Sequence, residues 1–252
     1  MGRPHRLGWP ACFFYALVSL IALPGASARA WHDMTHLAVA RAAGYERWYN
    51  AAGADMAKLK AGGRERYNHY FNNALGVDVT PALVLLQAQR YNAPEGIQGH
   101  LYGAVLGSLR RYLRSTEEGK YAEYNLAFCA HYVADLSQPL HNTPWDDFNR
   151  LRHTANDATV EDDGLPAITR NIRLHMYDIS LRGEDFERAV AREVARIANL
   201  SRHLGMRLRA EDRNMTREEA YTQLGHSASL LRAILIRLGK DVHVEESLPA
   251  AR

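Results

Sequence analysis

Apolar residues recur at spacings of three and four along most of this 252-residue chain, and no segment alternates apolar and polar residues as a half-buried strand does. Tyr124, Ala127, Phe128 and Tyr132, for example, are packing candidates within one predicted helix. The pattern predicts helices over residues 31–49, 80–90, 96–113, 120–137, 152–161, 184–203 and 216–238, and a short helix after residue 166. We therefore expect an all-α protein, a single domain of about eight or nine helices.

The ends of two predicted helices carry clear sequence signals. Thr80 and Pro81 provide a cap and a favoured first residue for the helix that follows them. Thr216 and Glu219 match a capping box at the start of the last helix, and Gly239 follows its end. These signals fix where the two helices start more firmly than the apolar spacing does.

Residues 1–30 have the composition of an export signal rather than of a folded segment. Two arginines make a basic start, residues 11–23 form an apolar run, and an Ala-Arg-Ala sequence at residues 28–30 is a small-x-small cleavage site. The apolar run is too short to span a membrane as a helix. We expect cleavage after Ala30, which leaves a helical domain of residues 31–252 that is secreted or periplasmic.

Removal of that segment changes both the charge balance and the cysteine count. The whole chain has 31 Lys and Arg against 28 Asp and Glu. Arg3, Arg6 and Arg29 leave with the segment, so the mature chain carries 28 basic and 28 acidic residues and has no general attraction for polyanions. Cys12 leaves as well, and Cys129 remains without a partner for a disulfide, so we expect it to be a small buried apolar residue.

The stretch from His131 to His141 carries the most suggestive chemistry. His131 and Asp135 are four residues apart, so a helix places both side chains on one face, one turn apart. Imidazole and carboxylate are among the ligands that zinc prefers. Pro139 breaks the helix and gives His141 a different direction. By itself a His-x-x-x-Asp pair is more often a hydrogen-bonded pair or a surface ion pair than a metal site.

Further candidate ligands lie on both sides of this stretch: Trp31, His36, Asp55, His69, His153 and Asp157. His153 and Asp157 repeat the four-residue spacing on the next predicted helix. Cleavage gives Trp31 a free amine, which can chelate an ion together with its own carbonyl oxygen. Each residue also has a simpler interpretation, such as a turn cap, a stacked ring, a surface pair or a half-buried helix histidine. It is improbable that all of these residues occur in this order by chance, so the simpler interpretations explain the complete set poorly.

With these residues in this order, the chain resembles the bacterial zinc-dependent phospholipases C and the related zinc nucleases specific for single strands. The resemblance covers essentially all of residues 31–252, and the segment HYVADLSQPLHN at residues 131–142 is its most specific part. It implies three Zn²⁺ ions in one cleft. The first ion would be bound by Asp55, His69, His131 and Asp135, the second by the amine and carbonyl of Trp31 with His36 and Asp135, and the third by His141, His153 and Asp157.

The resemblance also implies the reaction. A water molecule held by two of the zinc ions would supply hydroxide near neutral pH, and this hydroxide would attack a phosphodiester. Asp135, which would bridge two ions, and Asp55, which can accept a proton from the attacking water, would be the catalytic carboxylates. No protein nucleophile is required.

The two branches of this superfamily differ in substrate. The short spacing from His141 to His153, the neutral mature charge and the missing disulfide favour a monomeric phospholipase C that contacts membrane surfaces transiently and cleaves phospholipid head groups. The close spacing of Trp31 and His36, and the last ligand Asp157, favour the alternative, a nuclease acting on single-stranded DNA or RNA. A third possibility is a non-catalytic helical protein whose metal ions are structural.

Tyr70 and Phe71 follow His69 and are the candidate substrate-binding residues. Their rings can stack on a nucleobase or contact a choline group by a cation–π interaction, and core packing is the alternative. Residues 145–148 lie between two predicted ligands and either line the mouth of the cleft or form an ordinary surface connection. Five further histidines have no ligand-spaced partner that fits the ordered set, and we expect surface or packing roles for them: His100, His175, His203, His226 and His243.

Overall fold

The structure is a computed structural model that describes residues 31–61, 63–115, 120–183 and 185–242. Within these ranges every regular element is helical, with ten α-helices and four short 3₁₀-helices, and one isolated β-bridge joins Phe71 to Gly99. The all-α prediction is therefore confirmed. The predicted export signal, residues 1–30, lies outside the described residues.

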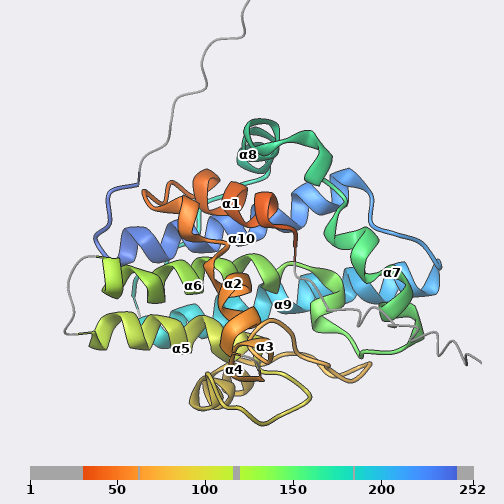
Figure 1. Cartoon of the computed structure of the whole chain (residues 1–252), viewed down its shortest axis with the longest axis horizontal. Coiled ribbons are helices and arrows are strands. Elements are labelled where there is room, and N and C mark those ends of the chain that lie inside the picture. The colour runs from red at the N-terminus through yellow and green to blue at the C-terminus, as the bar shows by residue number, and fades with distance from the viewer. Residues whose placement is uncertain (1–30, 62, 116–119, 184, 243–252) are drawn as a thin grey trace, which may run out of the picture.

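Helix α6 (Lys120–Leu136) lies at the centre of the arrangement (Figure 1). It runs beside α5 (Leu101–Arg114) on one side and α10 (Arg217–Arg237) on the other, and it also packs against α9 (Phe186–Ala210). Neighbouring helices therefore cover α6, and the polar residues His131 and Asp135 in its carboxyl-terminal half are removed from solvent.

Shorter elements cover this central group. On the α10 side, α1 (Asp33–Ala42) packs against α6, α8 (Leu165–Leu174) and α10. On the α5 side, α4 (Pro81–Gln87) continues into η2 (Ala88–Arg90) and packs against α5 and α9. Figure 1 shows these two layers above and below α6.

The remaining elements lie beside the carboxyl-terminal half of α6 and beyond its carboxyl end. η1 (Trp48–Asn50) and α2 (Gly53–Ala61) pack against α6, and α3 (Gly63–Arg66) packs against α2. Beyond the carboxyl end of α6, η3 (Pro139–Asn142) turns the chain toward α7 (Asp147–Asp157), and η4 (Glu161–Asp163) leads into α8. These elements supply most of the candidate ligands described below.

Buried apolar side chains form two clusters. The larger lies among α4, α5, α6, α9 and α10, and includes Leu106, Leu126 and Ile197. The smaller joins α1, α8 and α10, and includes Trp31 and Ile168, together with Ala134 of α6. Because α6 contributes to both clusters, its polar side chains at positions 131 and 135 lie between two apolar regions.

The predicted helix starts are confirmed at both capped positions. The Thr80 hydroxyl accepts a hydrogen bond from the Leu83 amide at 3.2 Å, and α4 begins at Pro81. At α10 the Thr216 hydroxyl accepts from the Glu219 amide at 3.2 Å, and the Glu219 carboxylate accepts from the Thr216 amide at 2.9 Å. Both bonds of the capping box are therefore present.

Several other boundaries differ from the apolar pattern: α5 begins at Leu101 instead of residue 96, for example, and α9 continues to Ala210 instead of ending near residue 203. α7 begins at Asp147 rather than near residue 152, because the Asp146 carboxylate accepts a hydrogen bond from the Asn149 amide at 3.1 Å and caps the helix there. The first predicted helix ends at Ala42 instead of near residue 49, and Gly44, with φ of 83°, turns the chain away. The pattern also assigned no helix to the region of α2 and α3, where few large apolar residues mark a buried face.

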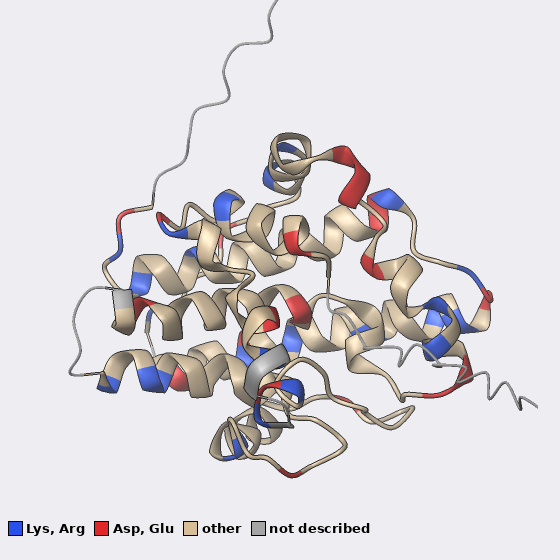
Figure 2. Ribbon diagram, viewed as in Figure 1, with Lys and Arg blue, Asp and Glu red and all other residues tan. Residues whose placement is uncertain are grey.

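Three features of the described residues relate to composition. Cys129 is fully buried, as predicted, and burial raises the pKa of its thiol to about 12. No helix among the described residues combines the length and the hydrophobicity needed to cross a membrane. Acidic and basic residues are distributed over many elements rather than gathered on one (Figure 2).

Candidate metal centre

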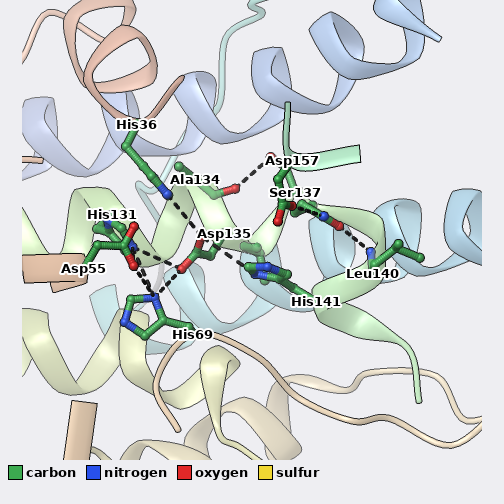
Figure 3. Close-up of polar contacts among 12 residues, drawn as sticks. His36, Asp55, His69, His131, Ala134, Asp135, Ser137, Leu140, His141 and Asp157 are labelled. Carbon is green, nitrogen blue, oxygen red and sulfur yellow. Dashed lines mark hydrogen bonds and ion pairs between the residues drawn. The ribbon is translucent and has the colours of Figure 1, made fainter. Parts of the chain in front are cut away.

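Two side chains of α6 form the middle of the site. His131 and Asp135 are both fully buried, and His131 Nε2 lies 3.3 Å from Asp135 Oδ2. The four-residue spacing that the sequence shows therefore brings the two groups together on one face of the helix. Figure 3 shows Asp135 at the centre, with histidines from other elements pointing toward it.

The first group adds a residue from α1. His36 is fully buried, and its Nε2 lies 3.4 Å from Asp135 Oδ1. Its ring stacks on that of His131, with centroids 3.7 Å apart. His36, His131 and Asp135 each offer a ligand atom, and these atoms lie within 4.8 Å of one another.

The second group adds Asp55 of α2 and His69, which follows α3. His69 Nδ1 lies 3.0 Å from Asp135 Oδ2, 3.2 Å from His131 Nε2 and 3.8 Å from Asp55 Oδ1. Asp55 in turn forms an ion pair with Lys58 at 2.6 Å. Asp55, His69 and His131 form a second set whose ligand atoms lie within 4.8 Å of one another, and His131 is common to both sets.

The third group lies beyond the end of α6. His141 comes from η3, and His153 and Asp157 come from α7, where His153 Nε2 lies 3.4 Å from Asp157 Oδ2. The rings of His141 and His153 stack with centroids 5.1 Å apart. His141 Nδ1 is also 3.7 Å from Asp135 Oδ1, so the third group adjoins the other two.

Several candidate ligand atoms in these groups are buried without a hydrogen-bond partner among the described residues: Nε2 of His36, Nδ1 of His141, Oδ1 of Asp135 and Oδ2 of Asp157. An unsatisfied buried polar atom costs roughly 1–3 kcal/mol. Metal ions would satisfy such atoms, and imidazole nitrogen and carboxylate oxygen without thiolate form a donor set that suits zinc. The residues present therefore fit the predicted type of ion.

The tautomer of His131 strengthens this fit. Its Nδ1 lies 2.8 Å from the carbonyl oxygen of Ala51, and a carbonyl can only accept, so Nδ1 carries the hydrogen. In the neutral ring, Nε2 then presents a lone pair to Asp135 Oδ2 at 3.3 Å. Two lone pairs facing each other in a buried site require a cation between them, either a proton or a metal ion.

Burial keeps two of the histidines in the form that binds metals. Desolvation lowers the pKa of His36 to about 3, with a further contribution from the neighbouring His131. Desolvation likewise lowers the pKa of His141 to about 4, against the opposing charge of Asp135. Both rings are therefore neutral near pH 7, as ligation requires.

The other ionisable groups respond to one another's charge. Burial opposes protonation of His131, but Asp135 and Asp55 outweigh it and raise its pKa to about 9. Burial would raise the pKa of Asp135, but His131 and His69 hold it well below its usual value. At Asp157 burial prevails and raises the pKa well above its usual value. Without metal, His131 therefore holds a proton near pH 7 that an arriving cation would displace.

Supporting residues that the sequence analysis missed hold the side chains of α7. The Asn149 side-chain oxygen lies 2.7 Å from His153 Nδ1, and the Gln138 amide donates to Asp157 Oδ1. Asn149 precedes His153 by four residues, so the i, i+4 spacing could have identified it. The contact between Gln138 and Asp157 joins two elements and leaves no such signal.

A cavity of about 410 Å³ opens beside the site. His69, His141 and His153 face it, so the second and third groups are accessible from it. Its other lining residues are two cations, three aromatic residues, one amide and two aliphatic residues: Lys58, Arg66, Tyr67, Tyr70, Trp145, Asn72, Ile97 and Leu140.

The two candidate substrate residues have different positions. Tyr70 lines the cavity, as expected for a substrate contact. Phe71 packs with the larger core cluster, its ring centroid 5.2 Å from that of Tyr102, which is the alternative role considered for it. From residues 145–148, Trp145 lines the cavity and Phe148 packs against the smaller core cluster.

Eight of the nine predicted ligands thus enter the three groups. Trp31 is fully buried in the smaller core cluster, two residues before the start of α1, the helix that carries His36. That the amine and carbonyl oxygen of Trp31 bind a zinc ion stays a prediction. Four of the histidines expected to be non-ligands are in none of the groups: His100, His175, His203 and His226. The fifth, His243, lies outside the described residues.

Comparison of the chain with protein-family models, curated proteins and solved structures gives no match. The functional argument therefore depends on the residues of the site and their geometry.

Proposed function

We propose that this protein is a zinc-dependent phosphodiester hydrolase with three zinc ions. The observation that carries the proposal is the convergence of imidazole and carboxylate groups, all buried except the partly exposed Asp55, from five elements and one connection around Asp135, beside an open cavity. A purely structural metal site is closed by protein ligands. Here three of the ligand histidines line a space large enough for a substrate.

Asp55, His69, His131 and Asp135 would hold one ion, His36 and Asp135 with the terminal Trp31 a second, and His141, His153 and Asp157 the third. Bound zinc would supply a Lewis acid that stabilises negative charge on a phosphodiester and lowers the pKa of water. The rest of the chemistry depends on the residues around the cavity.

Asp55 is the carboxylate best placed to accept a hydrogen bond from the attacking water molecule. Burial would raise its pKa, but His131, His69 and Lys58 together hold the pKa below its usual value. Its side chain is 20% exposed, in contrast to the fully buried Asp135. An ionised, partly exposed carboxylate can accept a hydrogen bond from a water molecule and orient it toward a phosphorus atom.

Two cations would bind the phosphodiester itself. Lys58 and Arg66 line the cavity that His69, His141 and His153 also face. A diester carries one negative charge, and cationic groups beside the reacting phosphate stabilise the additional charge of the transition state. Lys58 therefore has two partners in this proposal, the Asp55 carboxylate and the substrate.

Phospholipid is the substrate we favour, as expected from the spacing between His141 and His153. Ile97, Leu140 and Trp145 give the cavity an apolar part suited to the glycerol end of a lipid. The export signal of residues 1–30 would direct the enzyme to a compartment where membrane surfaces are available, and cleavage after Ala30 would free the amine of Trp31.

Single-stranded nucleic acid is the second candidate. The pair of cations, Lys58 and Arg66, suits a chain of phosphates, and Tyr67 and Tyr70 offer rings on which bases can stack.

The same two cations bear on the choice of phospholipid. A positively charged choline head group would be repelled by Lys58 and Arg66, which disfavours phosphatidylcholine relative to an anionic lipid.

A parallel assay tests these alternatives. Zinc-loaded protein beginning at Trp31 should be incubated with vesicles of phosphatidylcholine, vesicles of phosphatidylglycerol, denatured DNA and an aryl phosphodiester. We expect hydrolysis of the aryl diester and of lipid. Hydrolysis of DNA without lipid would establish the second candidate, and zinc-loaded protein that cleaves no diester would refute the hydrolase proposal.

A further inference from the structure

A buried carboxylate lies directly behind one of the candidate ligands. Glu65 of α3 is 4% exposed and precedes His69 by four residues. Its Oε1 lies 3.6 Å from His69 Nε2. Glu65 belongs to none of the three ligand groups, and the proposed reaction does not use it.

The His69 ring points in two directions. Its Nδ1 faces the metal centre, 3.0 Å from Asp135 Oδ2 and 3.2 Å from His131 Nε2. Its Nε2 faces Glu65 and is buried without a hydrogen-bond partner. Ligation through Nδ1 requires that nitrogen to be free of hydrogen, so the neutral ring must carry its hydrogen on Nε2.

The other contacts of Glu65 come from hydrogen-bond donors. The Tyr132 hydroxyl donates to Oε1, and the Asn68 amide donates to Oε2 at 3.4 Å. The Asn68 amide also contacts the Tyr132 hydroxyl at 3.3 Å and Asn92 Oδ1 at 2.8 Å. Glu65 is thus held as an acceptor, by a residue of α6 that directly follows His131.

We propose that Glu65 is a positioning residue for His69: it accepts the Nε2 hydrogen, fixes the tautomer and leaves Nδ1 free for the metal. The proposal rests on the metal centre of the proposed function. A shift of a few tenths of an ångström brings the 3.6 Å separation to an ordinary hydrogen bond. Such an outer carboxylate both orients a ligand histidine and makes it more basic.

Two other candidate ligand histidines are oriented in the same way, by a hydrogen-bond acceptor at one ring nitrogen. The Ala51 carbonyl contacts His131 Nδ1 at 2.8 Å, and the Asn149 side-chain oxygen contacts His153 Nδ1 at 2.7 Å. In each case an acceptor holds one ring nitrogen, and the other nitrogen faces the ligand group. His69 differs in that its acceptor is a carboxylate, which makes a stronger hydrogen bond than a neutral oxygen does.

Glu65→Gln tests the proposal, because the side chain keeps its size but loses its charge and gains a donor. The matched control is Glu123→Gln: Glu123 is also buried and accepts hydrogen bonds from Tyr45 and Lys240, and it belongs to none of the ligand groups. Zinc affinity of the mature chain should be measured by competition with a chromophoric chelator. We expect Glu65→Gln to weaken one of three ions by about 10–100-fold and the control to match wild type.

A second measurement locates the hydrogen on the His69 ring directly. Long-range ¹H–¹⁵N spectra of zinc-loaded wild type should show the His69 hydrogen on Nε2, and Tyr132→Phe should keep that tautomer with a smaller loss of affinity. Unchanged affinity in Glu65→Gln, or a hydrogen on Nδ1 of His69, would overturn the positioning role while leaving the hydrolase proposal intact. Wild type that binds no zinc would overturn both.

Discussion

Both carboxylate oxygens of Asp135 lie close to candidate ligand histidines. One oxygen lies 3.4 Å from His36 Nε2 and 3.7 Å from His141 Nδ1, and the other lies 3.0 Å from His69 Nδ1 and 3.3 Å from His131 Nε2. Because the side chain is fully buried, no water can replace the carboxylate without rearrangement of α6.

Asp135→Asn should therefore be the most damaging single substitution. The amide keeps the shape but offers one acceptor and a donor, so two ions lose a shared anionic ligand. We expect the zinc content to fall from three ions to one, with activity reduced by more than about 100-fold. Asp163→Asn, at a carboxylate that binds Tyr221 and Arg217 instead, is the control and should retain three ions. A fully loaded Asp135→Asn protein would contradict this role.

His100 allows a prediction about pH that does not involve the candidate ligands. Burial, aided by the charge of Arg90, lowers its pKa from 6.5 to about 4. The unfolded chain therefore binds a proton below pH 6.5 that the folded protein does not bind until about pH 4. The stability contributed by neutral His100 is complete above pH 6.5 and is lost as the pH falls toward 4.

Replacement by glutamine removes this titration. In the presence of a chelator, urea unfolding of His100→Gln should depend less on pH between about 6.5 and 4 than unfolding of wild type, by an amount on the order of 1 kcal/mol. His203→Gln, at a half-exposed histidine, serves as the control. Equal pH dependence in His100→Gln and wild type would show that His100 does not titrate differently in the two states.

At the scale of elements, the packing of α4 on α5 depends on a glycine. A Cβ on Gly103 would lie 2.1 Å from the backbone carbonyl carbon of Gln87 and 2.3 Å from the amide nitrogen of Ala88. Backbone atoms cannot move aside as a flexible side chain can. The two helices approach this closely only because residue 103 has no side chain.

Gly103→Ala should consequently destabilise the protein by about 3 kcal/mol, because the two helices must separate. Gly53→Ala is the comparison, since its Cβ would meet only Phe128 Cε1 at 3.5 Å, an ordinary contact. We expect that change to stay within about 1 kcal/mol of wild type. Chemical unfolding of the two variants measures the difference, and equal stabilities would refute the close approach.

The same scale shows what could be predicted from sequence. The first residues of α4 and α10 were predictable because the capping residues before them accept hydrogen bonds from backbone amides three positions away. The pairs on α6 and α7 were predictable because i, i+4 spacing places two side chains on one face. The early start of α7 was not, since it depends on the Asp146 cap rather than on apolar spacing.

Contacts between elements could not be predicted from the sequence. Nothing in the spacing of Ala51 and His131 indicates that a carbonyl of one holds the ring of the other, because the contact requires α6 to pack near the start of α2. The separation of Tyr70 and Phe71 into a cavity and a core likewise depends on the packing of Phe71 against Tyr102.

For the molecule as a whole, the candidate ligands come from elements distant in sequence. α1, α2, the residues after α3, α6, η3 and α7 each contribute at least one. Bound ions would therefore join α1, α2, α6, η3 and α7 at a single place. Ions that bind the folded state alone stabilise it by mass action.

Chelation should lower the midpoint of thermal unfolding, and zinc should restore it. At a free zinc concentration of about one hundred times Kd, each site contributes roughly 2.7 kcal/mol. Calorimetry of the mature protein with chelator, and then with added zinc, measures the change. The same midpoint in both conditions would show that the ligand groups hold no ion.

Processing provides another test of the whole molecule. If the amine of Trp31 is a ligand, one methionine added before Trp31 should weaken one ion and reduce activity, because the amine is displaced along the chain. A methionine added after Arg252 is the control. Full activity and three tightly bound ions in the amino-terminal variant would exclude the amine as a ligand.

The central claim is that three cations bind where these side chains converge. Anomalous diffraction at the zinc absorption edge, from crystals of the chain that begins at Trp31, tests it most directly. The account predicts one peak among Asp55, His69, His131 and Asp135, one between His36 and Asp135, and one among His141, His153 and Asp157. Zinc-soaked crystals with no anomalous peak in any of these groups would contradict it.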